Sequence, residues 1–347
     1  MTFSPDFNNI VQAAKNISPD RIPLYEHQIA DEIIESIMNR KLPDLDNCAD
    51  SELDSYFHTY CAFFKDMGYD TVSFERILSA VMPGNSALYG HEEGCIKVRS
   101  DFEDYPWEDL ADIFFERNKR YFDALRRNLP PGMKAIGGVG NGIFECAQDI
   151  TGYMNLCYIK VDDPFLYESL FKAIGNVLAQ IWKHFLSLYS DVFCVLRMGD
   201  DLGFKTNTLL PPEDIINYII PGYTKVIETV HSYGKPFLLH SCGNLFSIME
   251  NLISAGIDAK HSNEDEIAPM KKWYDLYGTR IGNFGGIDAD ILCRFSESEI
   301  TEYVTDIYNL SQGYGGVAIG SGNSIPDYMP VGNYLRMIDT LRNLREN

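Results

Sequence analysis

The sequence lacks a continuous apolar run of the ~20 residues that a membrane-spanning helix needs. Residues 1–24 also lack the basic and then apolar layout of a secretion signal. The 8 cysteines are scattered along the 347 residues, without the close spacing of a disulfide-rich scaffold. We therefore expect a cytoplasmic protein whose cysteines are mostly buried thiols, with no membrane partner.

Positive charge is scarce, since 29 Lys and Arg stand against 50 Asp and Glu, for a net charge of −21. Such a balance opposes binding to nucleic-acid phosphates unless a local basic patch exists. The basic clusters are short, such as Arg126 with Arg127 and Lys271 with Lys272. We therefore expect no nucleic-acid partner.

From about residue 130 onward, short β-rich runs alternate with amphipathic stretches, and Gly or Pro stands at most of the joins. Asp163 and Pro164 have the residue types that begin a helix, and apolar residues then recur at helical spacing to about residue 189. A second helical stretch, residues 212–234, contains Pro221 and Gly222, where we expect a kink or break.

Repeated βα units with short connections specify parallel strands, and eight such strands close into a barrel. The predicted fold class is α/β, a (β/α)8 TIM barrel with N-terminal helical additions outside it, near residues 1–20 and 30–65. We expect one domain over residues 1–347, of which 1–20 form an N-terminal extension. The expected strands lie near residues 22–27, 69–75, 133–140, 192–199, 236–241, 256–261, 280–286 and 316–320.

Polar side chains follow every predicted strand, at the end of the barrel where such proteins carry their active sites. These residues are Glu26, His27, Glu75, Asn141, Glu145, Asp200, Asp201, His240, Cys242, His261, Asn263, Glu264, Asp288, Ser321 and Asn323. Loops are polar in any protein, so the residue types matter more than their number.

The segment "FLLHSCGNLF" places His240 and Cys242 two positions apart at the end of a strand, so both side chains can point to one face. Imidazole and thiolate are zinc ligands. Gly243 lets the backbone turn away without crowding them. Simpler roles stay open for the neighbours: His261 as a hydrogen-bonded core residue, Asp200 and Asp201 as loop caps, and Glu264 as a first-turn acid of a helix.

Several segments, taken in order, resemble the uroporphyrinogen decarboxylase superfamily over roughly residues 20–345. They are "MGDDLGFKTNTLLPPE", "HSCGN", "GIDAKHSNED", "YGTRIGNFGGID" and "GSGNSIPDYMPVGNYLRM". The resemblance implies a single (β/α)8 barrel, in agreement with the strand pattern.

The superfamily includes the metal-free decarboxylase of heme synthesis, which binds its octacarboxylate substrate through an arginine-rich segment near the N-terminus. Here Arg21 and Arg40 are the only arginines among residues 1–75. Too few cations are present there to compensate eight carboxylates. Uroporphyrinogen decarboxylase activity is therefore the alternative, and a non-catalytic tetrapyrrole-binding regulator is a further one.

The other branch holds zinc-dependent, corrinoid-linked methyltransferases, including O-demethylase components, and the "GDDLGF" and "HSNED" segments look closer to these. The resemblance implies Zn²⁺ held by His240 and Cys242, a corrinoid (cobalamin) carried by a partner protein, and a small methylated ether, amine or thiol as substrate. The coenzyme M enzymes of this branch have a further cysteine after the eighth strand, where this chain has Ser321. Glu264 is our expected third ligand, with Glu26 in reserve.

The remaining polar residues at the strand ends receive roles within this hypothesis. Asp200, Asp201 and His261 are expected catalytic residues, which position the substrate or support the ligand histidine. The expected substrate-binding residues are Tyr25, Glu26, Asn141, Asn244 and Asn323.

Overall fold

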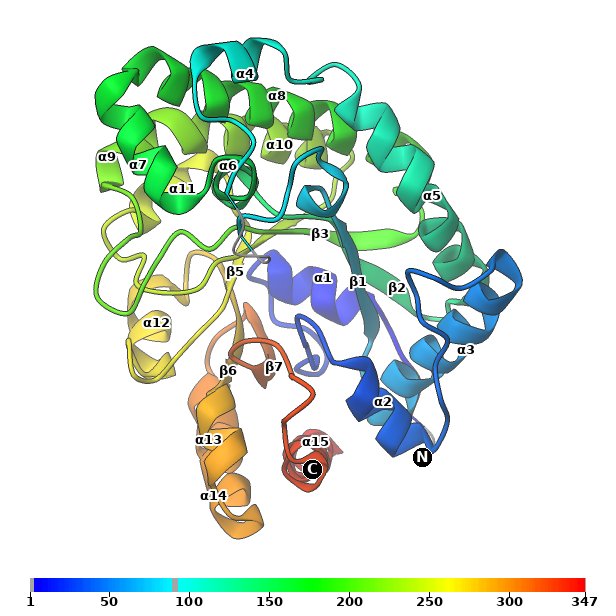
Figure 1. Ribbon diagram of the computed structural model, residues 1–347. Helices are drawn as coiled ribbons and strands as arrows, with labels where there is room; N and C mark the ends of the chain where they lie inside the picture. The colour runs from blue at the N-terminus through cyan, green and yellow to red at the C-terminus, as the bar shows by residue number, and fades with distance from the viewer. Residues whose placement is uncertain (1–2, 89–92, 347) are drawn as a thin grey trace.

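The computed structural model describes residues 3–88 and 93–346 and contains a curled parallel sheet with helices around it (Figure 1). Each strand pairs in parallel with the next along the chain, in the order β1 to β7. The strands are β1 Thr71–Ile77, β2 Lys134–Gly140, β3 Phe193–Gly199, β4 Phe237–His240, β5 Ala259–His261, β6 Gly282–Ile287 and β7 Val317–Ser321. The α/β, TIM-barrel-like fold class is confirmed, and all seven strands lie where the sequence predicts them.

The first predicted strand, residues 22–27, is the exception. It forms only a single parallel bridge, from Leu24 to Ile319 of β7. On the side facing β1, side chains replace the backbone ladder: Tyr60 donates to the carbonyl oxygen of Ser73 (2.8 Å), and the hydroxyl of Ser73 donates to that of Glu26. The prediction of an eighth strand is therefore wrong, because side-chain hydroxyls occupy the edge with which it would pair.

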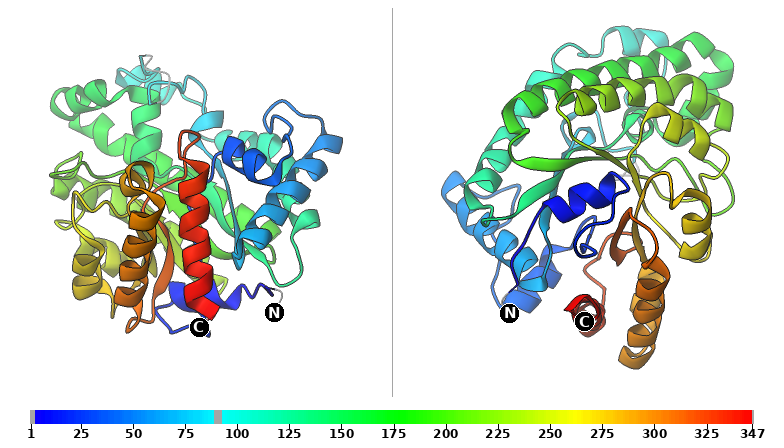
Figure 2. Two further views of the ribbon diagram at one scale, coloured as in Figure 1. Left: turned by 90° about the horizontal axis from the view of Figure 1, so that it is seen from below. Right: turned by 180° about the vertical axis from the view of Figure 1, so that it is seen from behind.

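Helices cover the outside of the sheet (Figures 1 and 2). The N-terminal helices are α1 Asn8–Ala14, α2 Asp31–Met38, α3 Asp50–Met67, the 3₁₀ turn η1 Ser79–Val81, α4 Arg99–Glu103 and α5 Leu110–Asn128. The central ones are α6 Ile143–Thr151, α7 Tyr153–Asp162, α8 Pro164–Tyr189, α9 Pro212–Asp214, the π-helical turn η2 Ile215–Ile219 and α10 Ile220–Ser232. The C-terminal ones are α11 Met249–Ala255, α12 Met270–Tyr277, α13 Ala289–Arg294, α14 Glu297–Ser311 and α15 Val331–Glu346.

The sequence predicts residues 1–20 outside the barrel, but helix α1 lies across one end of it. Its residues Ile10, Ala13 and Ala14 are fully buried and pack against the first residues of the strands, such as Val195 and Leu238. The helix therefore closes one end of the barrel (Figure 2) and leaves the carboxyl ends of the strands open.

Two predicted helix features have clear outcomes. The Asp163 side chain accepts a hydrogen bond from the N–H of Leu166 (3.0 Å), and Pro164 opens α8, as predicted. Near Pro221 the chain forms the π-helical turn η2 and then begins α10, with the proline in its first turn. Because proline offers no N–H to the preceding turn, the α-helical hydrogen-bond ladder is interrupted there.

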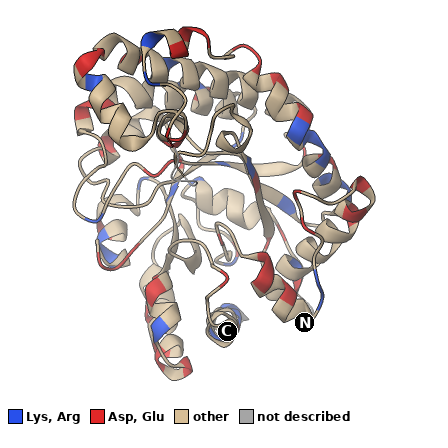
Figure 3. Ribbon diagram, viewed as in Figure 1, with Lys and Arg blue, Asp and Glu red and all other residues tan. Residues whose placement is uncertain are grey.

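Within residues 3–88 and 93–346, no helix is long and apolar enough to span a membrane. In the view of Figure 3, Lys and Arg are scattered among Asp and Glu over the outer helices.

Candidate metal and substrate site

A cavity of about 440 Å³ lies at the carboxyl ends of β1 to β4 and beside the segment after β7. Its walls come from far apart in the sequence: His27, Gln28, Glu75, Ile77, Asn141, Glu145, Gly199, Asp201, His240, Cys242, Asn323 and Ser324. None of these lining residues is Lys or Arg. The cavity thus has polar, partly acidic walls without a cationic side chain.

Three lining residues bring metal-ligand atoms together at one wall of the cavity. The Sγ of Cys242 lies 3.6 Å from Nε2 of His240, and this nitrogen lies 3.8 Å from Oδ1 of Asp201. All three groups offer ligand atoms within 4.8 Å of one another. Tetrahedral zinc with Zn–S of about 2.3 Å and Zn–N of about 2.0 Å separates its ligand atoms by about 3.5 Å. The donor set and its spacing therefore fit a zinc ion.

Strand pairing explains why Asp201 joins His240 and Cys242. Gly199 of β3 pairs with His240 of β4, so the segments that follow the two strands lie side by side. The N–H of Cys242 then donates to Oδ1 of Asp201 (2.9 Å). Gly243, with φ of +85°, lets the two loops touch, because a Cβ there would lie 2.1 Å from the backbone of Gly203.

Hydrogen bonds fix which nitrogen of His240 faces Cys242 and Asp201. Nε2 of His261 lies 3.0 Å from the carbonyl oxygen of Ser321, which can only accept, so this nitrogen carries the proton. The unprotonated Nδ1 of His261 then accepts from Nδ1–H of His240 at 2.8 Å. Consequently Nε2 of His240 keeps its lone pair for a metal.

His27 is a further member of this cluster, and its ring stacks on that of His240 with centroids 3.8 Å apart. Burial lowers the pKa of His27 and His240 well below the ordinary value, and lowers that of His261 to about 3. All three rings are therefore neutral at neutral pH. His27, His240 and His261 also form a second metal-capable group, but both nitrogens of His261 are already engaged.

Burial, and next the neighbouring Asp201, raises the pKa of the Cys242 thiol above its ordinary value. Without a cation the thiol therefore keeps its proton. A divalent metal displaces this proton when it binds, because the ligand form is the thiolate.

A buried ion pair, Arg197 with Glu75, adjoins the cavity through Glu75, which is one of the lining residues. Nε and one terminal nitrogen of Arg197 bond to Oε2 of Glu75 at 3.0 and 2.8 Å, while its other terminal nitrogen donates to the Tyr25 hydroxyl and to the carbonyl oxygen of His27, both at 3.0 Å. Arg197 is fully buried on β3. Burial raises the pKa of Tyr25 to about 12, so Tyr25 is a neutral hydrogen-bond partner of Arg197.

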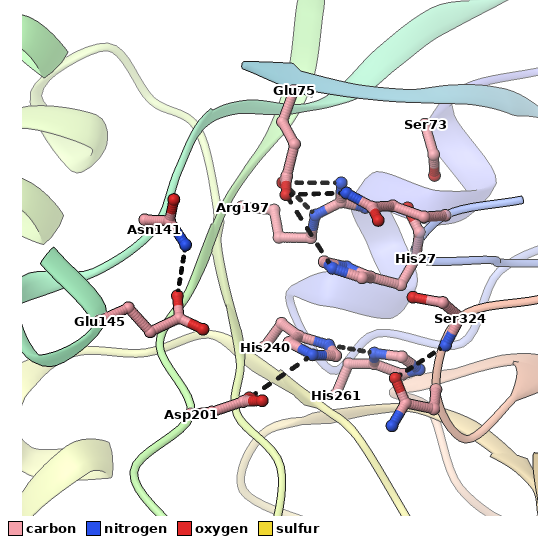
Figure 4. Close-up of polar contacts among 12 residues, drawn as sticks. His27, Ser73, Glu75, Asn141, Glu145, Arg197, Asp201, His240, His261 and Ser324 are labelled. Atoms are coloured by element: carbon pink, nitrogen blue, oxygen red, sulfur yellow. Dashed lines mark hydrogen bonds and ion pairs between the residues drawn. The ribbon is translucent and has the colours of Figure 1, made fainter. Parts of the chain in front are cut away.

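Another part of the wall contains Asn141 and Glu145 (Figure 4). Asn141 follows β2 in the left-handed region, with φ of +60°, which asparagine tolerates better than most residues. Its Oδ1 accepts from the Ser79 hydroxyl and its Nδ2 donates to Oε2 of Glu145, both at 2.7 Å. Burial, and next the carboxylates of Asp200 and Asp201, raises the pKa of Glu145 to about 8.

The family model of uroporphyrinogen decarboxylase matches residues 98–344. The chain belongs to this family. A search of curated proteins finds no match to the sequence.

Comparison with solved structures finds the fold of this uroporphyrinogen decarboxylase family member in another protein. One is a methyltransferase from Methanosarcina mazei, with a TM-score of 0.75, 14% identity, and coverage of 97% of this chain and 98% of that one. A broad-specificity endoglucanase from an uncultured bacterium has a lower TM-score of 0.47, with 9% identity and coverage of 97% and 96%. At 14% identity the likeness to the methyltransferase shows the fold and not the reaction.

The predicted third ligand of this family member, Glu264, lies elsewhere. It lines a neighbouring cavity of about 560 Å³, together with Lys205 and Asp288. Among the described residues, the two groups that could hold a metal do not include it. The structure instead brings Asp201 to His240 and Cys242.

The reserve ligand Glu26 is buried away from the cavity walls and bonds to Ser321. The Ser321 hydroxyl has two acceptor neighbours, Oε2 of Glu26 and the carbonyl oxygen of Asn323, but only one proton. A protonated Glu26 satisfies both contacts, and burial raises its pKa to about 8. On this side of the cavity it is Asn323 that contacts the thiol, with Nδ2 3.6 Å from Sγ of Cys242.

Two other predicted residues have mainly backbone partners. The fully buried carboxylate of Asp200 accepts from the N–H groups of Phe144 (3.0 Å) and Glu145 (2.9 Å) and from the Tyr223 hydroxyl, so it caps α6. Asn244 bonds to backbone groups of Thr206 and Phe246 and does not line the cavity. Neither residue is part of the cavity lining.

The sequence patterns assign no catalytic, substrate-binding or metal-binding role to His27, Glu75, Glu145 or Arg197. The first three appear as polar residues at strand ends, but that signal does not separate wall residues from loop residues. Arg197 is the one charged residue inside the apolar segment "VFCVLRMG", which is a signal for a buried ion pair.

Proposed function

We propose that this protein is a zinc-dependent methyltransferase, which moves a methyl group between a small methylated substrate and the corrinoid of a separate protein. The observation that carries the proposal is the convergence of His240 Nε2, Cys242 Sγ and Asp201 Oδ1 at the wall of a cavity. Family membership and the fold of the Methanosarcina mazei methyltransferase support it.

His240, Cys242 and Asp201 would hold the zinc, and His261 and Asn323 would act on these ligands through hydrogen bonds. Bound there, zinc supplies a Lewis acid toward the heteroatom that carries or receives the methyl group. His27 covers one face of the His240 ring, which shields that ligand from water.

The walls of the cavity favour a small, uncharged, hydrogen-bonding substrate. Gln28, Asn141, Asn323 and Ser324 supply amide and hydroxyl groups, and a volume of about 440 Å³ suits a molecule of modest size. An octacarboxylate tetrapyrrole needs cationic partners, whereas these walls contain none and already carry Glu75 and Asp201. These features count against the decarboxylase alternative.

We further propose the cytoplasm as the compartment. Cobalt(I) is easily oxidised, and the free cysteines of the chain also need reducing conditions to stay free. The cytosol is a reducing compartment.

The test is zinc analysis combined with methyl transfer. Zinc-replete protein is mixed with a methyl ether and cob(I)alamin, and methylcobalamin formation is followed by its visible spectrum. We expect about one zinc per chain, methylation of the cobalamin, and loss of both in Cys242→Ala. Zinc-free protein that releases carbon dioxide from uroporphyrinogen would establish the decarboxylase instead, and protein with tetrapyrrole binding but no turnover would establish the regulator.

A further inference from the structure

Glu145 is a carboxyl group in the cavity wall that the zinc site does not use. It comes from the first turn of α6, whereas the three metal-capable residues follow β3 and β4. Figure 4 shows Glu145 on the side of Asn141, with one oxygen bonded to this amide and the other turned toward the part of the site that holds His240 and Asp201. A substrate in the cavity can therefore contact both Glu145 and the zinc ligands.

The contacts of Asn141 fix how Glu145 is presented. Oδ1 of Asn141 accepts from the Ser79 hydroxyl, and its Nδ2 donates to Oε2 of Glu145. Oε2 of Glu145 is thereby an acceptor, so a proton on this carboxyl group resides on Oε1. Asn141 directly follows β2 with a positive φ, and this backbone conformation sets the direction in which its amide points toward Glu145.

The surroundings of Glu145 favour its protonated form. Burial is the main cause, and the carboxylate of Asp200, which the zinc site does not use, acts in the same direction. The histidines of the cavity, His27 and His240, are neutral. Around neutral pH the cavity thus contains one carboxylic acid able to give a proton to a bound molecule.

We propose that Glu145 is the general acid of this site and that the substrate is a small polar methyl ether. This inference rests on the proposed function. In the forward step the bond between the methyl carbon and the ether oxygen breaks, and its electron pair stays on the oxygen. The methyl group passes to the cobalt(I) corrinoid, which supplies the electron pair of the new bond to carbon. The proton on Oε1 of Glu145 moves to the oxygen, so the products are an alcohol or phenol and the Glu145 carboxylate, which solvent reprotonates.

The choice of an ether over the other methylated compounds follows from the same cavity. An alkoxide is a basic leaving group that gains strongly from a proton, whereas a thiolate leaves readily without one and a methylamine already carries a proton at neutral pH. A quaternary ammonium substrate has no lone pair to protonate and is usually held by aromatic rings. The described lining residues include no Phe, Tyr or Trp.

The experiment compares wild type with Glu145→Gln on a series of aryl methyl ethers whose phenols differ in acidity, with cob(I)alamin as acceptor. General acid catalysis contributes roughly 10²- to 10⁴-fold for basic leaving groups. We therefore expect Glu145→Gln to lose about 100-fold or more on the least acidic phenol, and progressively less as the phenol becomes more acidic. The wild-type rate should also fall above pH of about 8, as Glu145 ionises, and Glu145→Gln should lack this fall. Glu228→Gln, which removes an exposed carboxylate from α10, is the matched control.

The possible failures are distinct. An equal loss in Glu145→Gln across the whole series, or the same fall with pH in both proteins, would overturn the role of Glu145. Wild-type transfer from methyl thioethers or methylamines but from no ether would overturn the inference and leave the proposed function standing. Absence of transfer from every methylated compound would overturn both.

Discussion

Nδ1 of His261 lies 2.8 Å from Nδ1 of His240, and the opposite nitrogen of His261 bonds to the carbonyl oxygen of Ser321. A backbone carbonyl at the end of β7 thus determines the proton position on a histidine at the end of β4. The relay leaves Nε2 of His240 unprotonated beside Cys242. A metal-binding role for His240 accordingly depends on a residue that need not touch the metal.

Replacing His261 should weaken zinc binding without removing a ligand. In His261→Leu, Nδ1 of His240 loses its acceptor, so the ring can turn or change tautomer. Loss of such an outer partner typically lowers metal affinity by about 10- to 100-fold. Competition with a chromogenic chelator measures this change. His231→Leu, which alters an exposed histidine bonded to Asp258, should leave the affinity unchanged, and equal affinities for the two variants would contradict the relay.

Asp201 and Glu264 are alternative third ligands, and their amide variants separate them. Asp201→Asn should lower the zinc affinity, because it replaces a carboxylate that lies 3.8 Å from His240 Nε2. Glu264→Gln should bind zinc like the wild type, since Glu264 lies outside both metal-capable groups of the described residues. Metal analysis after dialysis against a weak chelator provides the comparison. A loss of zinc in Glu264→Gln alone would restore the expectation from the sequence.

Glu26 makes stability depend on pH. Its pKa is raised from 4.5 to about 8 in the folded protein, so the folded state holds a proton that the unfolded state releases between these values. The stabilisation is complete below pH of about 4.5 and is lost as pH rises toward 8, at up to about 1.4 kcal/mol per pH unit. Glu26→Gln should flatten this decline, because its amide N–H can replace the acid proton at Ser321. Urea denaturation at several pH values measures the slope, and an unchanged slope would contradict a protonated Glu26.

The Arg197–Glu75 pair should matter for folding far more than surface pairs do. Glu75→Ala leaves a fully buried guanidinium without its counter-ion, and breaking a buried pair costs about 3–5 kcal/mol. Glu250→Ala removes the exposed partner of Arg280, which should change stability far less, because solvent screens a surface ion pair. Chemical denaturation of both variants tests the difference. Equal losses would show that Arg197 finds another partner or water.

The sequence predicts those features that depend on short stretches of chain. Alternating apolar strands and amphipathic helices are local patterns, and seven strands lie at the predicted places. His240 and Cys242 could be paired because two residues at i and i+2 on one strand share a face. The prediction of a strand over residues 22–27 is wrong because the pairing there depends on side-chain contacts of Tyr60 and Ser73 at the edge of β1. The sequence of residues 22–27 contains no sign of these contacts.

The rest of the site depends on register and distance. Asp201 reaches Cys242 only because Gly199 pairs with His240, and strand pairing of this kind is not readable from either strand alone. Asp200, one residue earlier, points the other way and caps α6. Two adjacent aspartates thus have different surroundings, which composition and spacing could not distinguish.

The proposed function depends on one zinc ion held by Cys242, His240 and Asp201 beside the cavity. Zinc K-edge X-ray absorption on the metal-replete protein measures the neighbours of this ion. We expect one sulfur neighbour at about 2.3 Å and the remaining neighbours as nitrogen or oxygen at about 2.0–2.2 Å, with the sulfur signal lost in Cys242→Ser. A zinc shell without sulfur, a shell with two or more sulfurs, or a protein that retains no zinc would contradict it.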